Sequence, residues 1–99
     1  MNNESILKKC FTKDPSIVSR KIVGEFMLVP IRSKTAEIDS IYTLNEVAAR
    51  IWELVDGTIT AERIRDIILQ EYEVSSAEAE ADLVELLVQL ESIGAVKEA

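Results

Sequence analysis

The residues that could perform chemistry in this sequence are few, and their spacing does not assemble a catalytic site. Cys10 is the only cysteine and histidine is absent, so the chain has neither an internal disulfide nor the usual zinc ligand sets. The lack of histidine also removes the commonest general base at neutral pH, and nothing places a nucleophile beside a carboxylate or lysine. The sequence therefore predicts a non-enzymatic protein without cofactor or metal, in which Cys10 is an incidental thiol.

The composition predicts one folded domain over residues 1–99, in which residues 1–14 form a flexible or partly ordered N-terminal segment. Apolar residues make up 47% of the sequence and charged residues 29%, a balance typical of folded domains. A chain of 99 residues has room for one hydrophobic core. The longest apolar runs, such as residues 26–31, are too short to cross a bilayer, and the residues around Asn2, Asn3 and Glu4 lack the basic and apolar regions typical of a signal peptide. We expect a cytoplasmic protein, monomeric or dimeric, without a membrane partner.

Charge is unevenly distributed along the chain. The net charge of −7 disfavours binding to nucleic acid, because a phosphate backbone attracts basic surfaces. Residues 1–40 nevertheless carry seven basic and five acidic side chains, a net charge of +2, which leaves −9 for the remainder. The two parts of the chain are expected to present different surfaces.

The first half of the chain has the patterns of β-strands. Residues 16–22 are rich in β-branched side chains, Gly24 and Glu25 are typical of a tight turn, and residues 26–31 form an apolar run. Pro30 cannot donate to a sheet ladder, which favours a position at a strand end, edge or bulge. A third strand is predicted from residue 38, with weak alternation up to Leu44.

From Leu44 onward the apolar residues recur at helical spacing, in three segments that each follow a capping residue. Asn45, Thr60 and Ser75 can each accept hydrogen bonds from the free N–H groups at a helix start. Asp56 with Gly57 ends the first helix, and Gly94 ends the last. The last helix has a main apolar stripe, a polar face and a second stripe of small apolar residues. The main stripe consists of Ala79, Leu83, Leu86, Leu87, Leu90 and Ile93. The polar face consists of Glu78, Asp82, Glu85 and Gln89, and the second stripe consists of Ala77, Ala81, Val84 and Val88.

Three short strands cannot bury a face alone, so they should pack on the helices. The predicted fold class is α+β, a three-stranded antiparallel sheet followed by three helices, similar to a winged helix-turn-helix. A DNA-reading role is disfavoured because the last helix contains five acidic residues and no Lys or Arg between residues 75 and 93.

Several motifs in the second half resemble those of the PqqD family, the recognition elements for ribosomally synthesised precursor peptides. Leu44 and Asn45 precede a helix of small residues that ends at Asp56 and Gly57. A Thr-capped isoleucine helix, the leucine-rich last helix and a closing Ile-Gly-Ala-Val sequence at residues 93–96 follow in the family's order. The resemblance covers about the last 60 residues, in a chain whose size suits one domain.

The resemblance implies a peptide-binding site without an active site. Members of this family bind a leader peptide as an added strand along the third strand, in a groove whose opposite wall is the third helix. Here the strand residues would be Ile38, Asp39, Ser40, Ile41, Tyr42 and Thr43, and the wall residues Ala77, Ala81, Val84, Glu85 and Val88. The implied partners are a precursor leader peptide and a separate modifying enzyme, often a radical-SAM enzyme, as in pyrroloquinoline quinone (PQQ) biosynthesis.

Two other interpretations remain open. The first is a winged-helix interaction or regulatory module that binds no leader peptide. The second starts from Asp39, Ser40 and Ile41, which resemble the attachment sequence of acyl carrier proteins; that serine begins a helix, whereas Ser40 follows and precedes strand patterns. Under the preferred interpretation, the basic part of the chain favours a leader with acidic residues, and the acidic helices are free to contact the enzyme.

Overall fold

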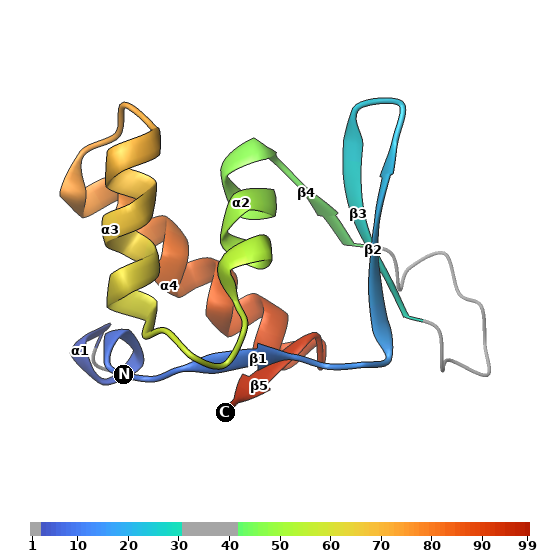
Figure 1. Ribbon diagram of the computed structural model, residues 1–99, viewed down its shortest axis with the longest axis horizontal. Coiled ribbons are helices and arrows are strands. Elements are labelled where there is room, and N and C mark those ends of the chain that lie inside the picture. Colours follow the sequence, from blue (N-terminus) through green and yellow to red (C-terminus); the bar gives the residue numbers. More distant parts are fainter. Residues whose placement is uncertain (1–2, 31–41) are drawn as a thin grey trace.

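The computed structural model describes residues 3–30 and 42–99. In chain order, the elements are α1 (Asn3–Leu7), β1 (Phe11–Lys13), β2 (Ile17–Ile22), β3 (Glu25–Pro30), β4 (Tyr42–Leu44), α2 (Glu46–Leu54), α3 (Ala61–Glu71), α4 (Ser76–Ser92) and β5 (Val96–Glu98). Figure 1 shows the β2–β3 hairpin standing apart from the helices, with β4 leading from it into α2. The predicted α+β class, a three-stranded antiparallel sheet with three helices after it, is confirmed.

Strands β2 and β3 form a hairpin with a two-residue turn, in register from Ile17 opposite Pro30 to Ile22 opposite Glu25. The turn residues are Val23 and Gly24, one position earlier than the predicted turn at Gly24 and Glu25. Both have positive φ, +50° at Val23 and +79° at Gly24, the combination that matches the right-handed twist of the flanking strands. The prediction missed this because valine rarely adopts such a conformation.

Strand β4 completes the described sheet, whose order is β2-β3-β4. It pairs antiparallel with β3, with Leu28 opposite Tyr42 and Phe26 opposite Leu44. The third strand was predicted from residue 38, and residues 38–41 lie outside the described part of the chain. Within that part β4 is an outer strand of the sheet, followed at once by the N-cap of α2.

The three predicted helices begin at the predicted caps. The side chain of Asn45 accepts a hydrogen bond from the Ala48 N–H at 2.8 Å. In the same way, Thr60 Oγ1 accepts one from the Arg63 N–H at 3.3 Å, and Ser75 Oγ accepts one from the Glu78 N–H at 3.1 Å. Each bond satisfies an N–H group that has no partner inside the helix. At the end of α4 the Ala95 N–H donates to the Leu90 carbonyl at 2.8 Å, while Gly94 has a φ of +77°. This glycine cap turns the chain sharply into β5.

A second sheet, which the sequence did not predict, joins the two ends of the chain. Strand β1 pairs antiparallel with β5, with Phe11 opposite Glu98 and Lys13 opposite Val96. Helix α1 precedes it, so residues 3–13 of the expected flexible or partly ordered segment contain a helix and a strand. The buried side chains of Ile6, Leu7 and Phe11 hold them on the core. Strands of three residues are too short for alternation to reveal them.

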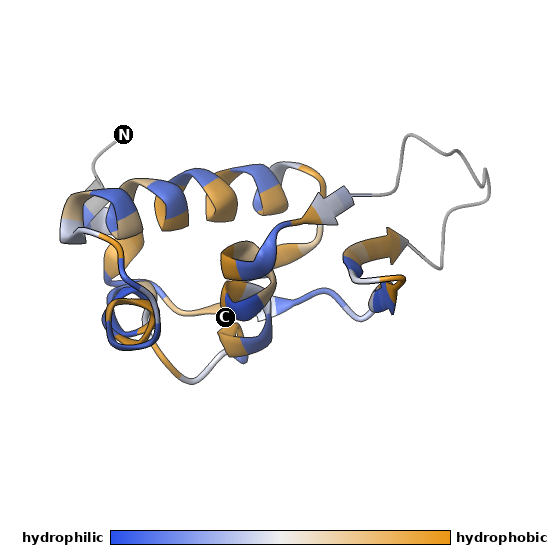
Figure 2. Cartoon of the chain, turned by 90° about the horizontal axis from the view of Figure 1, so that it is seen from above, coloured by the Kyte–Doolittle hydropathy of each residue, from blue (hydrophilic) through white to orange (hydrophobic). Residues whose placement is uncertain are grey.

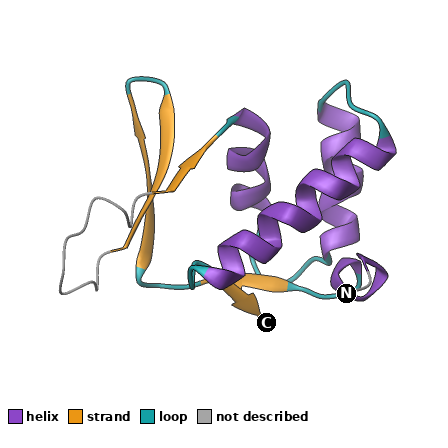
Figure 3. Ribbon diagram, turned by 180° about the vertical axis from the view of Figure 1, so that it is seen from behind, coloured by secondary structure: helices purple, strands orange, loops and turns teal. Residues whose placement is uncertain are grey.

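The core lies between the helices, and both sheets contribute to it through Leu28 and Leu44 and through Phe11 and Val96. It contains the predicted α4 stripe from Ala79 to Leu90, together with Ile51 and Trp52 of α2 and Ile64 and Ile68 of α3. Figure 3 shows α4 crossing α2 and α3 on one side of the molecule, and Figure 2 shows hydrophobic and hydrophilic residues alternating around the helices. The prediction of Ile93 in the stripe is wrong: it is 48% exposed because it lies beyond the last turn of α4. Within the described residues, none of the helices combines the length and apolar character needed to cross a bilayer.

Candidate functional site

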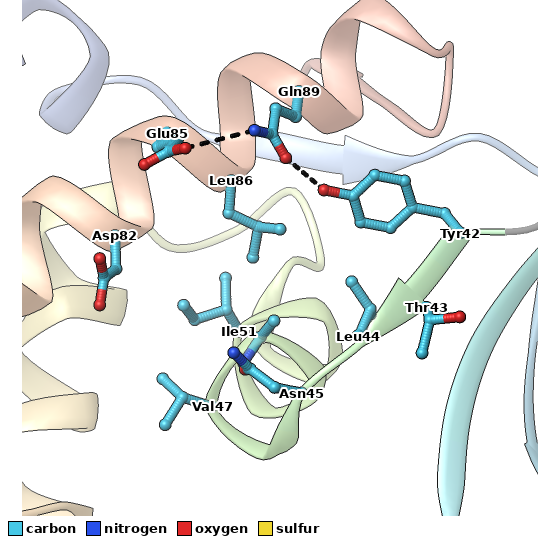
Figure 4. Close-up of a pocket in the computed structure, with 11 residues that line it drawn as sticks. Tyr42, Thr43, Leu44, Asn45, Val47, Ile51, Asp82, Glu85, Leu86 and Gln89 are labelled. Atoms are coloured by element: carbon cyan, nitrogen blue, oxygen red, sulfur yellow. Dashed lines mark hydrogen bonds between the residues drawn. The ribbon is translucent and has the colours of Figure 1, made fainter.

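A groove lies between the end of β4, the first turns of α2 and one face of α4 (Figure 4). Its volume is about 260 Å³. The residues that line it come from all three elements: Tyr42, Thr43, Leu44, Asn45, Val47, Ala48, Ile51, Asp82, Glu85, Leu86 and Gln89. The groove thus runs beside the outer strand of the described sheet.

The floor of the groove is apolar and rigidly held. Leu44, Ile51 and Leu86 are buried core residues that also line it. Val47 and Ala48, on the first turn of α2, are partly buried against the same core. Because these side chains pack from a strand and two helices, the floor keeps its shape without a ligand. An apolar side chain of a bound molecule would find preformed apolar surface there.

The α4 wall of the groove is polar. Asp82, Glu85 and Gln89 recur at helical spacing, so they project from one face of α4, and all three are exposed. The Gln89 amide donates to Glu85 Oε1 at 3.4 Å, and the Tyr42 hydroxyl donates to Gln89 Oε1. This second bond links β4 to α4 at one end of the groove (Figure 4).

The position of α2 is fixed on its side away from the groove by an ion pair with α3. Arg50 donates from Nε to Glu71 Oε1 at 2.7 Å and from its terminal nitrogen to Oε2 at 2.8 Å. The two parallel bonds suit the planar geometry of a guanidinium and a carboxylate. They lower the pKa of Glu71 below its ordinary value of 4.5, chiefly through the hydrogen bonds from Arg50.

The structure brings together part of the predicted site. Tyr42 and Thr43 of the predicted strand, and Glu85 of the predicted wall, line the groove. The other wall residues do not line it: Ala77, Ala81 and Val88 are exposed, and Val84 packs partly against the core. Four predicted strand residues, Ile38, Asp39, Ser40 and Ile41, lie outside the described part of the chain.

Several lining residues were not predicted as part of the site. They are Leu44, Asn45, Val47, Ala48, Ile51, Asp82, Leu86 and Gln89. The sequence carried a signal for some of them, because Asp82 and Gln89 share a helix face with Glu85 and were already identified as polar. The resemblance to the family places the wall on the second stripe instead, at Ala77, Ala81, Val84 and Val88, together with Glu85.

The chemistry that this arrangement supports is binding. Among residues 3–30 and 42–99, no group of three His, Cys, Asp or Glu side chains is placed to hold a metal ion. The groove offers a strand edge, an apolar floor and a polar wall, which together suit an extended polypeptide.

Comparison with known proteins identifies relatives of the same fold. Residues 25–96 match the model of the family described as coenzyme PQQ synthesis protein D (PqqD). This range contains β3, β4 and all three helices that follow. A search of curated protein sequences finds no match.

Two solved structures resemble the chain over most of its length. One is TbiB1 in complex with the TbiA(β) leader peptide, with a TM-score of 0.70 and 28% identity; 87% of this chain and 94% of that chain are covered. The other is a lasso peptide synthetase B1 complexed with the leader peptide, with a TM-score of 0.72 and 25% identity; 88% of this chain and 96% of that chain are covered. The motifs in the sequence predicted this family. Because the family model matches more than half of the chain, this protein belongs to the PqqD family.

Proposed function

We propose that this protein is a non-catalytic binding domain that holds the leader of a ribosomally synthesised precursor peptide in the groove beside β4. The observation that carries the proposal is the position of that groove, between an outer strand of the described sheet and the polar face of α4. Family membership and two structural relatives that are complexes with leader peptides support it.

Strand addition accounts for how such a site binds. An outer strand has backbone N–H and C=O groups available to an extended peptide, and these give affinity without regard to the peptide's sequence. Alternate side chains of the peptide then face α4 and the apolar floor, which select among peptides by the size and charge of these side chains. Residues 38–41, which the sequence analysis also assigned to the peptide-binding strand, lie outside the described part of the chain.

The second part of the proposal is that binding delivers the peptide to a separate modifying enzyme. A bound leader keeps the attached core peptide near the enzyme, which raises its effective concentration without any chemistry in this chain. The cytoplasm, where ribosomes release the precursor, is the proposed place of action. PQQ biosynthesis with a radical-SAM enzyme and a lasso-type pathway are the two candidate systems, favoured by the family match and by the solved relatives respectively.

Amide chemical-shift mapping tests the binding proposal. The ¹⁵N-labelled chain is titrated with each short peptide encoded beside its gene, and with the TbiA(β) leader as a comparison. We expect shifts at Tyr42, Thr43 and Asn45 and on the Asp82, Glu85 and Gln89 face of α4. Binding by none of the peptides, or shifts confined to α1, β1 and β5, would contradict the proposal.

Reconstitution tests the delivery proposal. The chain is mixed with each candidate modifying enzyme encoded nearby, and the turnover of full-length precursor is measured with and without the chain. Modification should be slower without the chain and be restored by adding it. Equal turnover in its absence would remove this part of the proposal while leaving peptide binding intact.

A further inference from the structure

The groove carries charge of one sign. Asp82 and Glu85 line it from α4, and no Lys or Arg is among its described lining residues. All the other lining residues are uncharged. A molecule in this groove would therefore meet two carboxylates above an apolar floor.

The described Arg and Lys side chains that form ion pairs do so elsewhere. Arg50 pairs with Glu71 and Glu53, Arg65 with Asp66 and Glu80, and Lys9 with Glu98. Within residues 3–30 and 42–99, Asp82 and Glu85 take part in no ion pair, and Glu85 accepts a long hydrogen bond from Gln89. Their charge is thus free to act on a bound molecule.

We propose that the groove selects peptides with a Lys or Arg side chain at the position that passes Asp82 and Glu85. This inference rests on the proposed function, because it names the kind of peptide that the same groove takes. It reverses the expectation from the charge count, which favoured a leader with acidic residues. The charge of the lining, rather than the sum over the first forty residues, is what a bound peptide meets at short range.

The shape of the groove suits a long basic side chain. A peptide strand beside β4 directs alternate side chains toward α4. The methylene groups of Lys or Arg can cover Leu86 and Ile51 of the floor while the cation reaches the carboxylates at the exposed wall. Arg adds a planar fork that can contact both oxygens of one carboxylate.

Selection from a displayed library of random peptides tests the proposal independently of the natural leader's sequence. Binders are selected on the wild-type chain, on Asp82→Asn/Glu85→Gln and on Asp82→Lys/Glu85→Lys. The matched control is Glu73→Gln/Glu91→Gln, which removes two exposed carboxylates outside the groove. Wild type and control should enrich Lys or Arg at one fixed position, the neutral variant should lose the enrichment, and the lysine variant should enrich Asp or Glu there.

Affinity measurements on one selected peptide complete the test. We expect the neutral variant to bind it about three- to tenfold more weakly, as befits two partly exposed ion pairs. The difference in affinity between wild type and the neutral variant should shrink when the salt concentration is raised to about 1 M, where the Debye length falls to about 3 Å. Replacing the basic residue of the peptide with its neutral isostere should produce a similar loss on wild type and none on the neutral variant.

The outcomes separate this inference from the proposed function. If wild type selects groove-binding peptides that have no basic preference, or an acidic one, the charge selection is wrong and peptide binding stands. If no peptide shifts the amides of Tyr42 to Asn45, both fail. Circular dichroism of the variants shows that each is folded before its selection is interpreted.

Discussion

The hydroxyl of Tyr42 donates a hydrogen bond to the side-chain oxygen of Gln89, which joins β4 to α4 across one end of the groove (Figure 4). The two residues are 47 positions apart in the chain. Tyr42 sits at the start of β4, and Gln89 also donates to Glu85 on the wall. The spacing between strand and helix at this end is therefore set by side chains that also line the binding surface.

Removing this bond should cost a modest amount of stability. We expect Tyr42→Phe to lower the free energy of unfolding by about 0.5–1 kcal/mol, because a single hydrogen bond near the surface contributes about that much. Urea denaturation measures the change. Gln89→Leu provides the second arm of a double-mutant cycle, and the two losses should be less than additive. Strict additivity would mean that the bond does not form in solution.

Filling the groove should block peptide binding without unfolding the protein. Ala48 and Ala49 are neighbours on α2 and both are partly buried, but Ala48 lines the groove and Ala49 lines a separate cavity with Arg50 and Tyr72. Ala48→Leu should weaken binding of a groove peptide about tenfold, since the added side chain occupies the volume that the peptide needs. Isothermal titration calorimetry measures the affinity.

Ala49→Leu is the matched control for this experiment. It adds the same side chain to the same helix, so any general effect of overpacking appears in both variants. Its peptide affinity should stay within about twofold of wild type. An equal loss in both variants would show that the leucine acts through the packing of α2 rather than by occupying the groove.

The helices could be predicted from the sequence because their caps and stripes are local signals. Asn45, Thr60 and Ser75 each bind an N–H three residues ahead, an interaction that depends only on neighbouring residues. The β1–β5 sheet depends instead on contact between the two ends of the chain. Nothing in three residues such as Phe11–Lys13 encodes a partner at the opposite end of the sequence, so this sheet could not be predicted.

The wall of the groove could be predicted only in part, for a reason that lies in the geometry of α4. The helix buries its leucine stripe and leaves two flanks, one polar at Asp82, Glu85 and Gln89, and one small and apolar at Ala77, Ala81 and Val88. Sequence alone does not determine which flank faces β4. Tertiary packing of α4 against α2 and α3 decides it, and it brings the polar flank to the groove.

Replacing Val23 at the tip of the β2–β3 hairpin should make the protein more stable. Val23 is β-branched, has a φ of +50° and is 96% exposed, so its backbone is strained and its side chain adds no packing. Val23→Asn should raise the free energy of unfolding by about 0.5–1 kcal/mol, because Asn followed by Gly suits this turn. Thermal and urea unfolding measure the gain.

The neighbouring glycine gives the opposite expectation at the same turn. Gly24 has a φ of +79°, and a Cβ added there would meet nothing within 4 Å. Gly24→Ala should therefore lower the free energy of unfolding by about 1 kcal/mol through backbone strain alone. A stabilising Gly24→Ala, or a neutral Val23→Asn, would show that the turn adopts another conformation in solution.

The Arg50–Glu71 pair should make part of the protein's stability depend on pH. Arg50 lowers the pKa of Glu71 in the folded state, mainly by its hydrogen bonds. A carboxyl whose folded pKa is depressed contributes stability above its unfolded pKa, and this contribution is lost as pH falls through the folded value. Glu71→Gln should therefore lower the melting temperature at neutral pH, and its difference from wild type should shrink in acid.

The control for this pH dependence is Glu73→Gln, which removes an exposed carboxylate that forms no ion pair within residues 3–30 and 42–99. Its melting temperature should follow that of wild type across the same range. An NMR titration adds a direct check: the Glu71 carboxyl should titrate below 4.5 in wild type and move upward in Arg50→Gln, because the bidentate donor is gone. A Glu71 midpoint that does not move in Arg50→Gln would mean that the ion pair does not fix α2 against α3.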